Sequence, residues 1–348
     1  MEENLIEIEK KNLIGRKKFN SAQLMGDFPP KIYNNNKKIV FGIACPPDCN
    51  HSGDLVFSRW SQINWPEEAY SPTKNSTRHV MEENIYHYTP SNFALSNTLE
   101  WHVNFADKRL FGYYGGPLFA QDEMQVAEHP ILGAVRECMS SLEVEDSRFG
   151  PYTRDVDSIP TPILIRGVER RVEISVNPSY ESPFGLYGRE FSSASENAIR
   201  TATKALIPPS ISNIIAMEAP KYGKGSYSLK VIQDVFNTAY TAFLAARIES
   251  YHHVSDVPHV IVHTGNWGTG AYGGNKTLMA ILQILSARVA GIDTLVYHTF
   301  QAESSKKYEE ALTILNTDLI PDDQEVQIIN ILFKIEKMKF NWGVSDGN

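Results

Sequence analysis

Short apolar runs and longer amphipathic segments alternate along most of the chain. The apolar runs, rich in β-branched residues, predict strands at 38–44, 99–106, 161–167, 170–176, 211–219, 258–264 and 293–300. Apolar residues at helical spacing predict helices at 121–141 (interrupted at Pro130), 193–206, 228–250, 276–290, 304–315 and 322–338. Strands that alternate with helices are typical of an α/β fold in which helices cover a sheet.

Most of the first 95 residues lack this regular alternation. Residues 1–37 are polar and charged and are expected to form an accessory arm or loose lead-in, and residues 45–95 are rich in Pro, Asn, Ser and His and are expected to be loops. We therefore predict an accessory N-terminal region at 1–95, a core at 96–302 and C-terminal helices at 303–348 that pack on the core.

Composition narrows the class of partner. The chain has 348 residues, 42% of them hydrophobic and 21% charged, with a net charge of −8, so a nucleic-acid partner is not expected. No apolar run is long enough to span a bilayer, and the start lacks the apolar stretch of a secretory leader. Three cysteines, an odd number, favour a reducing compartment. We expect a cytoplasmic protein, or one in a host cytosol if it is a delivered effector.

A glycine-rich stretch joins the strand at 258–264 to the helix at 276–290. It places Gly265, Gly268, Gly270, Gly273 and Gly274 between the two elements. Glycines allow close backbone approach, and a following helix start favours anions, so this order suits a phosphate. The stretch is neither a P-loop nor a dinucleotide fingerprint. On the glycines alone, a phosphate loop and a plain connecting turn explain it equally well.

The sequence of this stretch resembles a signature of one known family. "TGNWGTGAYGGN" (264–275), followed by a helix and the strand "DTLVYHTF", is similar to the signature of the poly(ADP-ribose) glycohydrolases, with Thr269, Tyr272 and Asn275 at positions where the family has Cys, Phe and Asp. "VNFADKRLFGYYGGPLFAQDEMQ" (103–125) resembles the family's catalytic region. The resemblance spans roughly residues 98–300. It implies a macrodomain fold, ADP-ribose and ADP-ribosylated protein as partners, and hydrolysis at ribose C1″. The sequence contains no HExxH, DxDxDG or paired-Asp cluster, so we expect no metal and no other cofactor.

The resemblance also assigns roles to three consecutive residues. Glu123 matches the family's acid/base, Asp122 would hydrogen-bond the ribose or the water, and Gln121 would help to position the substrate. Glycoside cleavage needs such a carboxyl, because it protonates the leaving group and then activates water. Without the glycine stretch, Asp122 and Glu123 would read as acids favoured by a helix N-terminus.

Several positions depart from the family's pattern. The family's unbroken glycines are here replaced by "GYYGG", and the Asn and Asp that flank Phe-Ala are exchanged, giving Asn104 and Asp107. An acid near the reacting ribose would attract a guanidinium leaving group. We therefore hypothesise a mono-ADP-ribosylated substrate, with arginine as a candidate acceptor. The alternative is that Asp107 pairs with Lys108, Arg109 or another base.

The remaining substrate contacts follow from the same resemblance. Phe300 would stack on adenine, and Tyr272 would pack over the phosphate and ribose. The predicted substrate-binding residues are Asn104, Gly112, Tyr113, Tyr114, Gly115, Gln121, Gly265, Asn266, Trp267, Gly268, Thr269, Gly270, Ala271, Tyr272, Gly273 and Phe300. Competing functions are a glycohydrolase of the polymer, a reader that binds ADP-ribose without cutting it, and an enzyme of free nucleotide derivatives.

Other potential ligands of metal ions are sparse in the sequence. Cys45, Cys49 and His51 form C-x3-C-x-H, but a zinc site needs a fourth ligand and better spacing, so coincidence is the expectation. His87, His102 and His129 stand alone and are expected to be ordinary polar or surface histidines. We predict no metal site.

Overall fold

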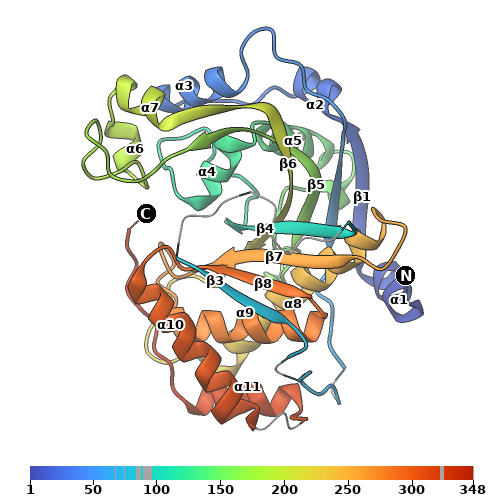
Figure 1. Ribbon diagram of the computed structural model, residues 1–348. Coiled ribbons are helices and arrows are strands. Elements are labelled where there is room, and N and C mark those ends of the chain that lie inside the picture. Colours follow the sequence, from blue (N-terminus) through green and yellow to red (C-terminus); the bar gives the residue numbers. More distant parts are fainter. Residues whose placement is uncertain (67, 74, 84–87, 89–95, 322–324, 348) are drawn as a thin grey trace.

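One mixed sheet of eight strands forms the centre of the molecule, and helices cover both of its faces (Figure 1). The structure, a computed structural model, describes residues 1–66, 68–73, 75–83, 88, 96–321 and 325–347. The strand order is β1-β2-β5-β6-β4-β7-β8-β3. This arrangement confirms the predicted α/β class and the predicted sheet between helical layers.

The elements have the following bounds. The strands are β1 Leu13–Asn20, β2 Asp54–Trp60, β3 Arg78–Glu82, β4 Thr98–Ala106, β5 Ile163–Ile174, β6 Thr203–Glu218, β7 His259–Gly265 and β8 Thr294–His298. The helices are α1 Glu3–Asn12, α2 Ser21–Asp27, α3 Asn35–Ala44, α4 Gln121–Glu128, α5 Ile131–Leu142, α6 Glu190–Ser193, α7 Glu196–Ala202, α8 Leu229–Tyr251, α9 Lys276–Ala290, α10 Ala302–Thr313 and α11 Ile328–Lys337, with a 3-10 helix η1 Ser147–Phe149 and a π-helix η2 Ile314–Leu319.

The two faces of the sheet belong to two different apolar cores. Along β6, Ile215 and Met217 join the core formed with α8 and α9, whereas Ile214 and Ala216 join the core formed with α2 and α5. Successive side chains of a strand point to opposite faces, so a strand buried on both sides is apolar throughout. This explains why 211–219 reads as one continuous apolar run.

The central strands fix where a ligand can bind. β6, β4, β7 and β8 are mutually parallel neighbours, so their carboxyl ends, at Glu218, Ala106, Gly265 and His298, reach the same edge of the sheet. Ligands in open parallel sheets bind beyond this edge, where loops leave the strands. Among the helices of the described residues, none combines the length and the hydrophobicity that crossing a lipid bilayer requires.

Residues 38–44 form a helix, so the predicted strand is wrong. They belong to α3, whose start is capped by the Asn34 side chain accepting from the Lys37 amide. Lys37, Val40 and Ala44 are buried, and their spacing of three and four residues marks one helical face. The run of β-branched residues at its centre imitated a strand, and packing decided otherwise.

The N-terminal residues are ordered, so the loose lead-in is also wrong. They form α1, β1 and α2, and β1, β2 and β3 are strands of the main sheet that the sequence reading missed. β1 lies at the edge of the sheet and carries Arg16, Lys17 and Lys18, which obscure alternation and protect an edge from pairing.

Most other boundaries agree with expectation. The elements expected at 99–106, 228–250, 258–264, 276–290, 293–300 and 304–315 lie within two residues of their predicted ends, and the break at Pro130 separates α4 from α5. The strands expected at 161–167 and 170–176 are one strand, β5, with a register shift at Gly167. β6 starts inside the helix expected at 193–206, and the helix expected at 322–338 begins at Ile328, with 322–324 outside the described residues.

Gly115 is expected to be sensitive to substitution. Its carbonyl accepts hydrogen bonds from the amides of Tyr33 and Asn34, and a Cβ there would collide with the carbonyl oxygen of Lys31. We predict that Gly115→Ala lowers the free energy of unfolding by roughly 1–3 kcal/mol, as overpacking does. At Gly116 the nearest atom to a Cβ is 3.4 Å away, so Gly116→Ala should leave stability unchanged. Chemical unfolding of both variants checks this, and equal losses would contradict it.

Candidate functional site

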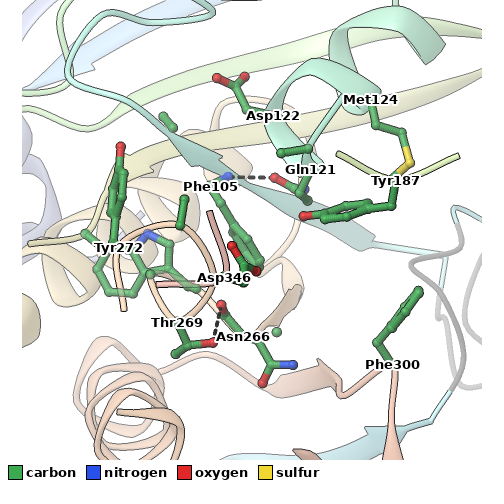
Figure 2. Close-up of a pocket in the computed structure, with 18 of the residues that line it drawn as sticks. Phe105, Gln121, Asp122, Met124, Tyr187, Asn266, Thr269, Tyr272, Phe300 and Asp346 are labelled. Carbon is green, nitrogen blue, oxygen red and sulfur yellow. Dashed lines mark hydrogen bonds between the residues drawn. The ribbon is translucent and has the colours of Figure 1, made fainter. Parts of the chain in front are cut away.

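A cavity of about 780 Å³ opens at the carboxyl edge of the parallel strands. Residues just past β4, β6, β7 and β8, together with the start of α4, line it. Most of the predicted site residues line this cavity, and some of them are shown in Figure 2: Asp107, Tyr113, Gln121, Asp122, Glu123, Gly265, Asn266, Trp267, Gly268, Thr269, Gly270, Ala271, Tyr272 and Phe300. Asn104, Gly112, Tyr114, Gly115 and Gly273 do not line it.

The glycine-rich loop after β7 is folded tightly on itself. The Trp267 amide donates to the Gly265 carbonyl (2.7 Å), and the Gly274 amide donates to the Gly268 carbonyl (2.9 Å). Gly268 has a φ of 72°, a conformation that glycine adopts without cost. Within the described part of the chain, the amides of Gly270, Ala271 and Tyr272 have no hydrogen-bond acceptor. Such successive amides make a cradle for an anion.

Three polar side chains anchor this loop. The buried Trp267 donates from Nε1 to the carbonyl of Met217 (3.1 Å), and Asn266 donates to the carbonyl of Thr299 (3.1 Å). The Thr269 hydroxyl donates to the Asn266 carbonyl (3.0 Å; Figure 2). These bonds join the loop to the ends of β6 and β8, so Asn266, Trp267 and Thr269 fix the cradle in place.

Gln121 fixes the start of α4 against the end of β4. Its Oε1 accepts from the amide of Phe105 (2.8 Å; Figure 2), and its Nε2 donates to the carbonyl of Val103 (3.0 Å). The Asn104 side chain, which is fully buried, donates to Oδ1 of Asp122 (3.1 Å). β4 therefore holds the first helical turn through two side chains, and this turn carries both acids.

The two acids lie side by side in a buried setting. Glu123 is 3% exposed, and one of its oxygens accepts from the Ala120 amide (3.0 Å). Burial raises the pKa of Glu123, although the positive charge of Lys37 opposes that rise. Burial, followed by the charge of Glu123, raises the pKa of Asp122 well above its usual value. Burial favours the protonated form of a carboxyl, so both acids are shifted towards that form.

Lys37 is a charged neighbour that the sequence did not reveal. It comes from α3, is fully buried, and donates from Nζ to the carbonyl of Tyr114 (2.8 Å). Burial lowers the pKa of Lys37 to about 8, although Glu123 and Asp122 support its charge. Lys37 lies at the end of the stretch expected to be an accessory arm or loose lead-in (1–37), so no signal in the sequence connects it with the acids.

Asp107 forms an ion pair with Lys221, so the pairing alternative for Asp107 holds, with a base other than Lys108 and Arg109. Lys221 also contacts Glu218 (2.8 Å), and the Tyr272 hydroxyl donates to Asp107 (3.1 Å). Burial alone would raise the pKa of Asp107, but the bonds from Lys221 and the Arg109 amide hold it below its usual value. Asp107 is therefore a carboxylate whose negative charge is already balanced by Lys221.

The aromatic residues divide between the cavity and the core. Phe300 follows β8 at a φ of 66°, is 47% exposed, and projects beside the cavity (Figure 2). A bulky residue at positive φ is strained, and such strain is concentrated at ligand sites. Tyr113 is 57% exposed and lines the cavity, whereas the buried Tyr114 turns away and donates its hydroxyl to Glu137 (2.8 Å). Only one of the two inserted tyrosines can therefore meet a ligand.

A segment from the far end of the sequence crosses the glycine-rich loop. The Gly343 amide donates to the Gly273 carbonyl (2.8 Å), and the Asp346 amide lies 3.4 Å from the Gly270 carbonyl. The Asp346 side chain reaches into the cavity (Figure 2), which Lys276 also lines. Gly273 thus packs under this segment and does not face the cavity. No motif in the sequence pointed to Asp346, since its position depends on how the chain end folds back.

His102 and His129, expected to be ordinary polar or surface histidines, are both buried in the structure. His129 is buried, with its two ring nitrogens 2.8 Å from the Gln125 carbonyl and 3.0 Å from the Ser212 hydroxyl, as expected of a satisfied polar group. His102 is buried and stacks on His263. His87 lies outside the described residues.

Comparison with known proteins supports the resemblance seen in the sequence. Residues 162–307 match the family model described as poly(ADP-ribose) glycohydrolase (PARG), macro domain fold. The predicted family resemblance is confirmed over this range. The matched range includes the whole glycine-rich loop but begins after Glu123. The placement of Asp122 and Glu123 beside this loop therefore comes from the structure and not from the family match. The matched family is one of glycosidases, which agrees with the predicted enzyme class.

Solved PARG structures are similar to this chain at low sequence identity. The poly(ADP-ribose) glycohydrolase of Thermomonospora curvata is 11% identical, with 88% of this chain and 96% of that chain covered and a TM-score of 0.43. The enzyme of Deinococcus radiodurans in complex with ADP-ribose is 11% identical, with 91% and 100% covered and a TM-score of 0.43.

The charge of Lys37 should hold down the pKa of the acid pair. We predict that Lys37→Met raises the pKa of Glu123, because a positive charge beside the ionised carboxylate is lost. Lys38→Met, which changes the exposed neighbouring lysine, is the matched control and should leave that pKa unchanged. Carboxyl-carbon NMR titration measures both. An unchanged Glu123 pKa in a folded Lys37→Met protein would show that Lys37 does not act on the acid.

Proposed function

We propose that this protein is an ADP-ribosyl hydrolase that cleaves the ribose C1″ bond of ADP-ribosylated proteins, with Glu123 as acid/base. One observation carries the proposal: a single cavity holds both the amide cradle of the glycine-rich loop and the buried acid pair of α4. An anion cradle suits a diphosphate, and a buried carboxyl suits cleavage of a glycosidic bond.

The cavity offers a place for each part of ADP-ribose. The diphosphate would lie on the amides of Gly270, Ala271 and Tyr272, with Lys276 at the start of α9 as a nearby cation. Adenine would stack on the exposed ring of Phe300. The distal ribose would then reach the start of α4, where Glu123 lies.

Glu123 would carry the proton in both halves of the reaction. It first gives its proton to the leaving atom as the C1″ bond breaks and the ribose becomes oxocarbenium-like. The carboxylate then takes a proton from the water that attacks C1″, which releases ADP-ribose and restores the acid. Burial raises the pKa of Glu123 and so favours the protonated form that this step uses. Asp122, held by Asn104, would hydrogen-bond the ribose or the water.

The acceptor side favours mono-ADP-ribose over a long polymer. Tyr113 stands exposed at the cavity where the family's glycines would leave open backbone, and the chain has a net charge of −8, which opposes a polyanion. Arginine remains a candidate acceptor, but the ion pair of Asp107 with Lys221 weakens the attraction that suggested it. All three cysteines are free, in agreement with a cytoplasmic compartment.

Two other functions fit fewer observations. A reader of ADP-ribose would use the cradle but has no need of a buried acid pair with raised pKa values. An enzyme of free nucleotide derivatives would cut at phosphate, and its product would be AMP.

A panel of substrates tests the proposal directly. We predict that the protein releases ADP-ribose from proteins that carry a single ADP-ribose, tested on arginine, glutamate and serine, and little from polymer. Glu123→Gln should reduce turnover by roughly 10²–10⁴, the usual contribution of a general acid/base, while ADP-ribose affinity by calorimetry stays the same. Release at the wild-type rate by Glu123→Gln would remove Glu123 from the mechanism. Binding without release by the wild type would make it a reader, and AMP as product would exclude the glycosidic reaction.

The Asp346 carboxylate should weaken binding of an anionic ligand. It lies against the cradle, within 3.0 Å of where a Gly270 Cβ would be, so it repels a diphosphate there. We predict that Asp346→Asn binds ADP-ribose a few-fold more tightly at low salt, since unit charges about 4 Å apart in water interact by about 1 kcal/mol. The gain should shrink as salt screens the charges. Calorimetry at two salt concentrations checks this, with the exposed Asp318→Asn as control. Identical affinities for Asp346→Asn and wild type would refute the placement of the diphosphate.

A further inference from the structure

We propose that Cys45, Cys49 and His51 form a binding site for Zn²⁺ outside the cavity. Their ligand atoms, two thiol sulfurs and one imidazole nitrogen, all lie within 4.8 Å of one another. The sequence favoured coincidence because the C-x3-C-x-H spacing is unusual. In the structure this spacing nevertheless brings the side chains together. Cys45 lies at the C-terminal end of α3, and the Cys49 amide donates to the Pro46 carbonyl (2.9 Å). This bond closes a turn that brings the Cys49 thiol back towards the Cys45 thiol.

His51 is oriented as a metal-binding histidine would be. Its Nδ1 lies 2.8 Å from Oε2 of Glu169, which leaves Nε2 facing the thiol of Cys45 at 3.6 Å. Metal-binding histidines usually give their second ring nitrogen to a carboxylate in this way, and the carboxylate sets the tautomer and the direction of the ring. The histidine and Glu169 side chains are only 6% and 4% exposed, so the pair is a built feature of the interior.

The loop that carries the ligands is held in place by the protein itself. Glu169 also accepts from the Ser52 amide (3.0 Å) and from Arg171 (2.7 Å). Arg171 in turn donates to the carbonyls of Ala44 (3.0 Å) and Asn50 (3.3 Å), on either side of the loop that contains both cysteines. A metal ion therefore finds the three ligands close together and does not have to order the loop.

The donor set selects the kind of ion. Two thiolates and one imidazole are soft and borderline ligands that suit Zn²⁺ and do not suit Mg²⁺ or Ca²⁺. Zn²⁺ prefers four ligands in a tetrahedron, so water would take the fourth position. The ion would join the end of α3 to β5 through Glu169. This proposal is independent of the proposed hydrolase, because Lys37, at the opposite end of α3, is held by its own hydrogen bond to the Tyr114 carbonyl.

Metal titration of the full-length reduced protein tests the site. After treatment with a chelator, the protein is titrated with Zn²⁺ against a chromophoric competitor, and with Co²⁺ for its spectrum. We expect one ion per chain, with thiolate-to-cobalt charge-transfer absorption and the visible bands of tetrahedral cobalt. Cys45→Ser and Cys49→Ser should each show a weaker charge-transfer band, because one thiolate remains, and should bind at least tenfold more weakly. Cys138→Ser, which changes the buried third cysteine in another core, is the matched control and should match wild type.

A second variant separates positioning from ligation. Glu169→Gln should weaken Zn²⁺ binding by roughly 10–100-fold, the usual effect of losing such a partner, while the charge-transfer absorption persists at saturating cobalt. Thermal unfolding without metal shows whether each variant is folded. Affinity for Zn²⁺ unchanged in folded Cys45→Ser, or cobalt spectra without thiolate absorption, would overturn the proposal. So would a Cys45–Cys49 disulfide that forms quantitatively in air while the reduced protein binds no metal.

Discussion

The amide side chain of Gln121 joins the two halves of the candidate site. It uses both of its polar groups on the backbone of β4, at Phe105 and Val103, and so fixes the first turn of α4 at the carboxyl edge of the sheet. A buried amide that loses such partners leaves polar groups unsatisfied, at a cost of about 1–3 kcal/mol each. Through this contact, acids from one part of the chain meet a glycine-rich loop that follows them by more than a hundred residues.

Charge within the cavity is arranged in two groups with different tasks. On one side, Asp107, Lys221, Glu218 and Arg154 form a continuous series of ion pairs past the ends of β4 and β6. Charges paired in this way compensate one another and hold this wall of the cavity in place. On the other side, the charge of Lys37 compensates the acids of α4 only in part, so burial raises their pKa values. The two environments leave a proton available in one place and fix charge in the other.

Sequence patterns predicted the elements whose formation depends on neighbouring residues in the chain. The strand-to-helix order around β7 and α9, the break at Pro130 and the glycine-rich loop all follow from short-range signals in the sequence. The sequence predicts a strand in place of α3 because β-branched residues at its centre favour strands. The helix forms because its apolar face packs against the core and the Asn34 side chain caps its start. β1 was missed because an edge strand with three basic residues shows no apolar alternation. Similarly, Lys221 and Asp346 line the cavity through tertiary contacts that no sequence spacing encodes, and the same holds for the effect of Lys37 on the acids. The approach of Cys45, Cys49 and His51 to one another also depends on Glu169 from β5, which holds His51.

The central claim is that the cradle holds a diphosphate while Glu123 faces the anomeric carbon of the attached ribose. A crystal structure of the protein with ADP-ribose tests it most directly. The account predicts diphosphate oxygens within about 3 Å of the amides of Gly270, Ala271 and Tyr272, and a Glu123 oxygen at hydrogen-bond distance from the C1″ hydroxyl. A ligand that binds elsewhere, or a Glu123 carboxylate turned away from the ribose, would contradict it.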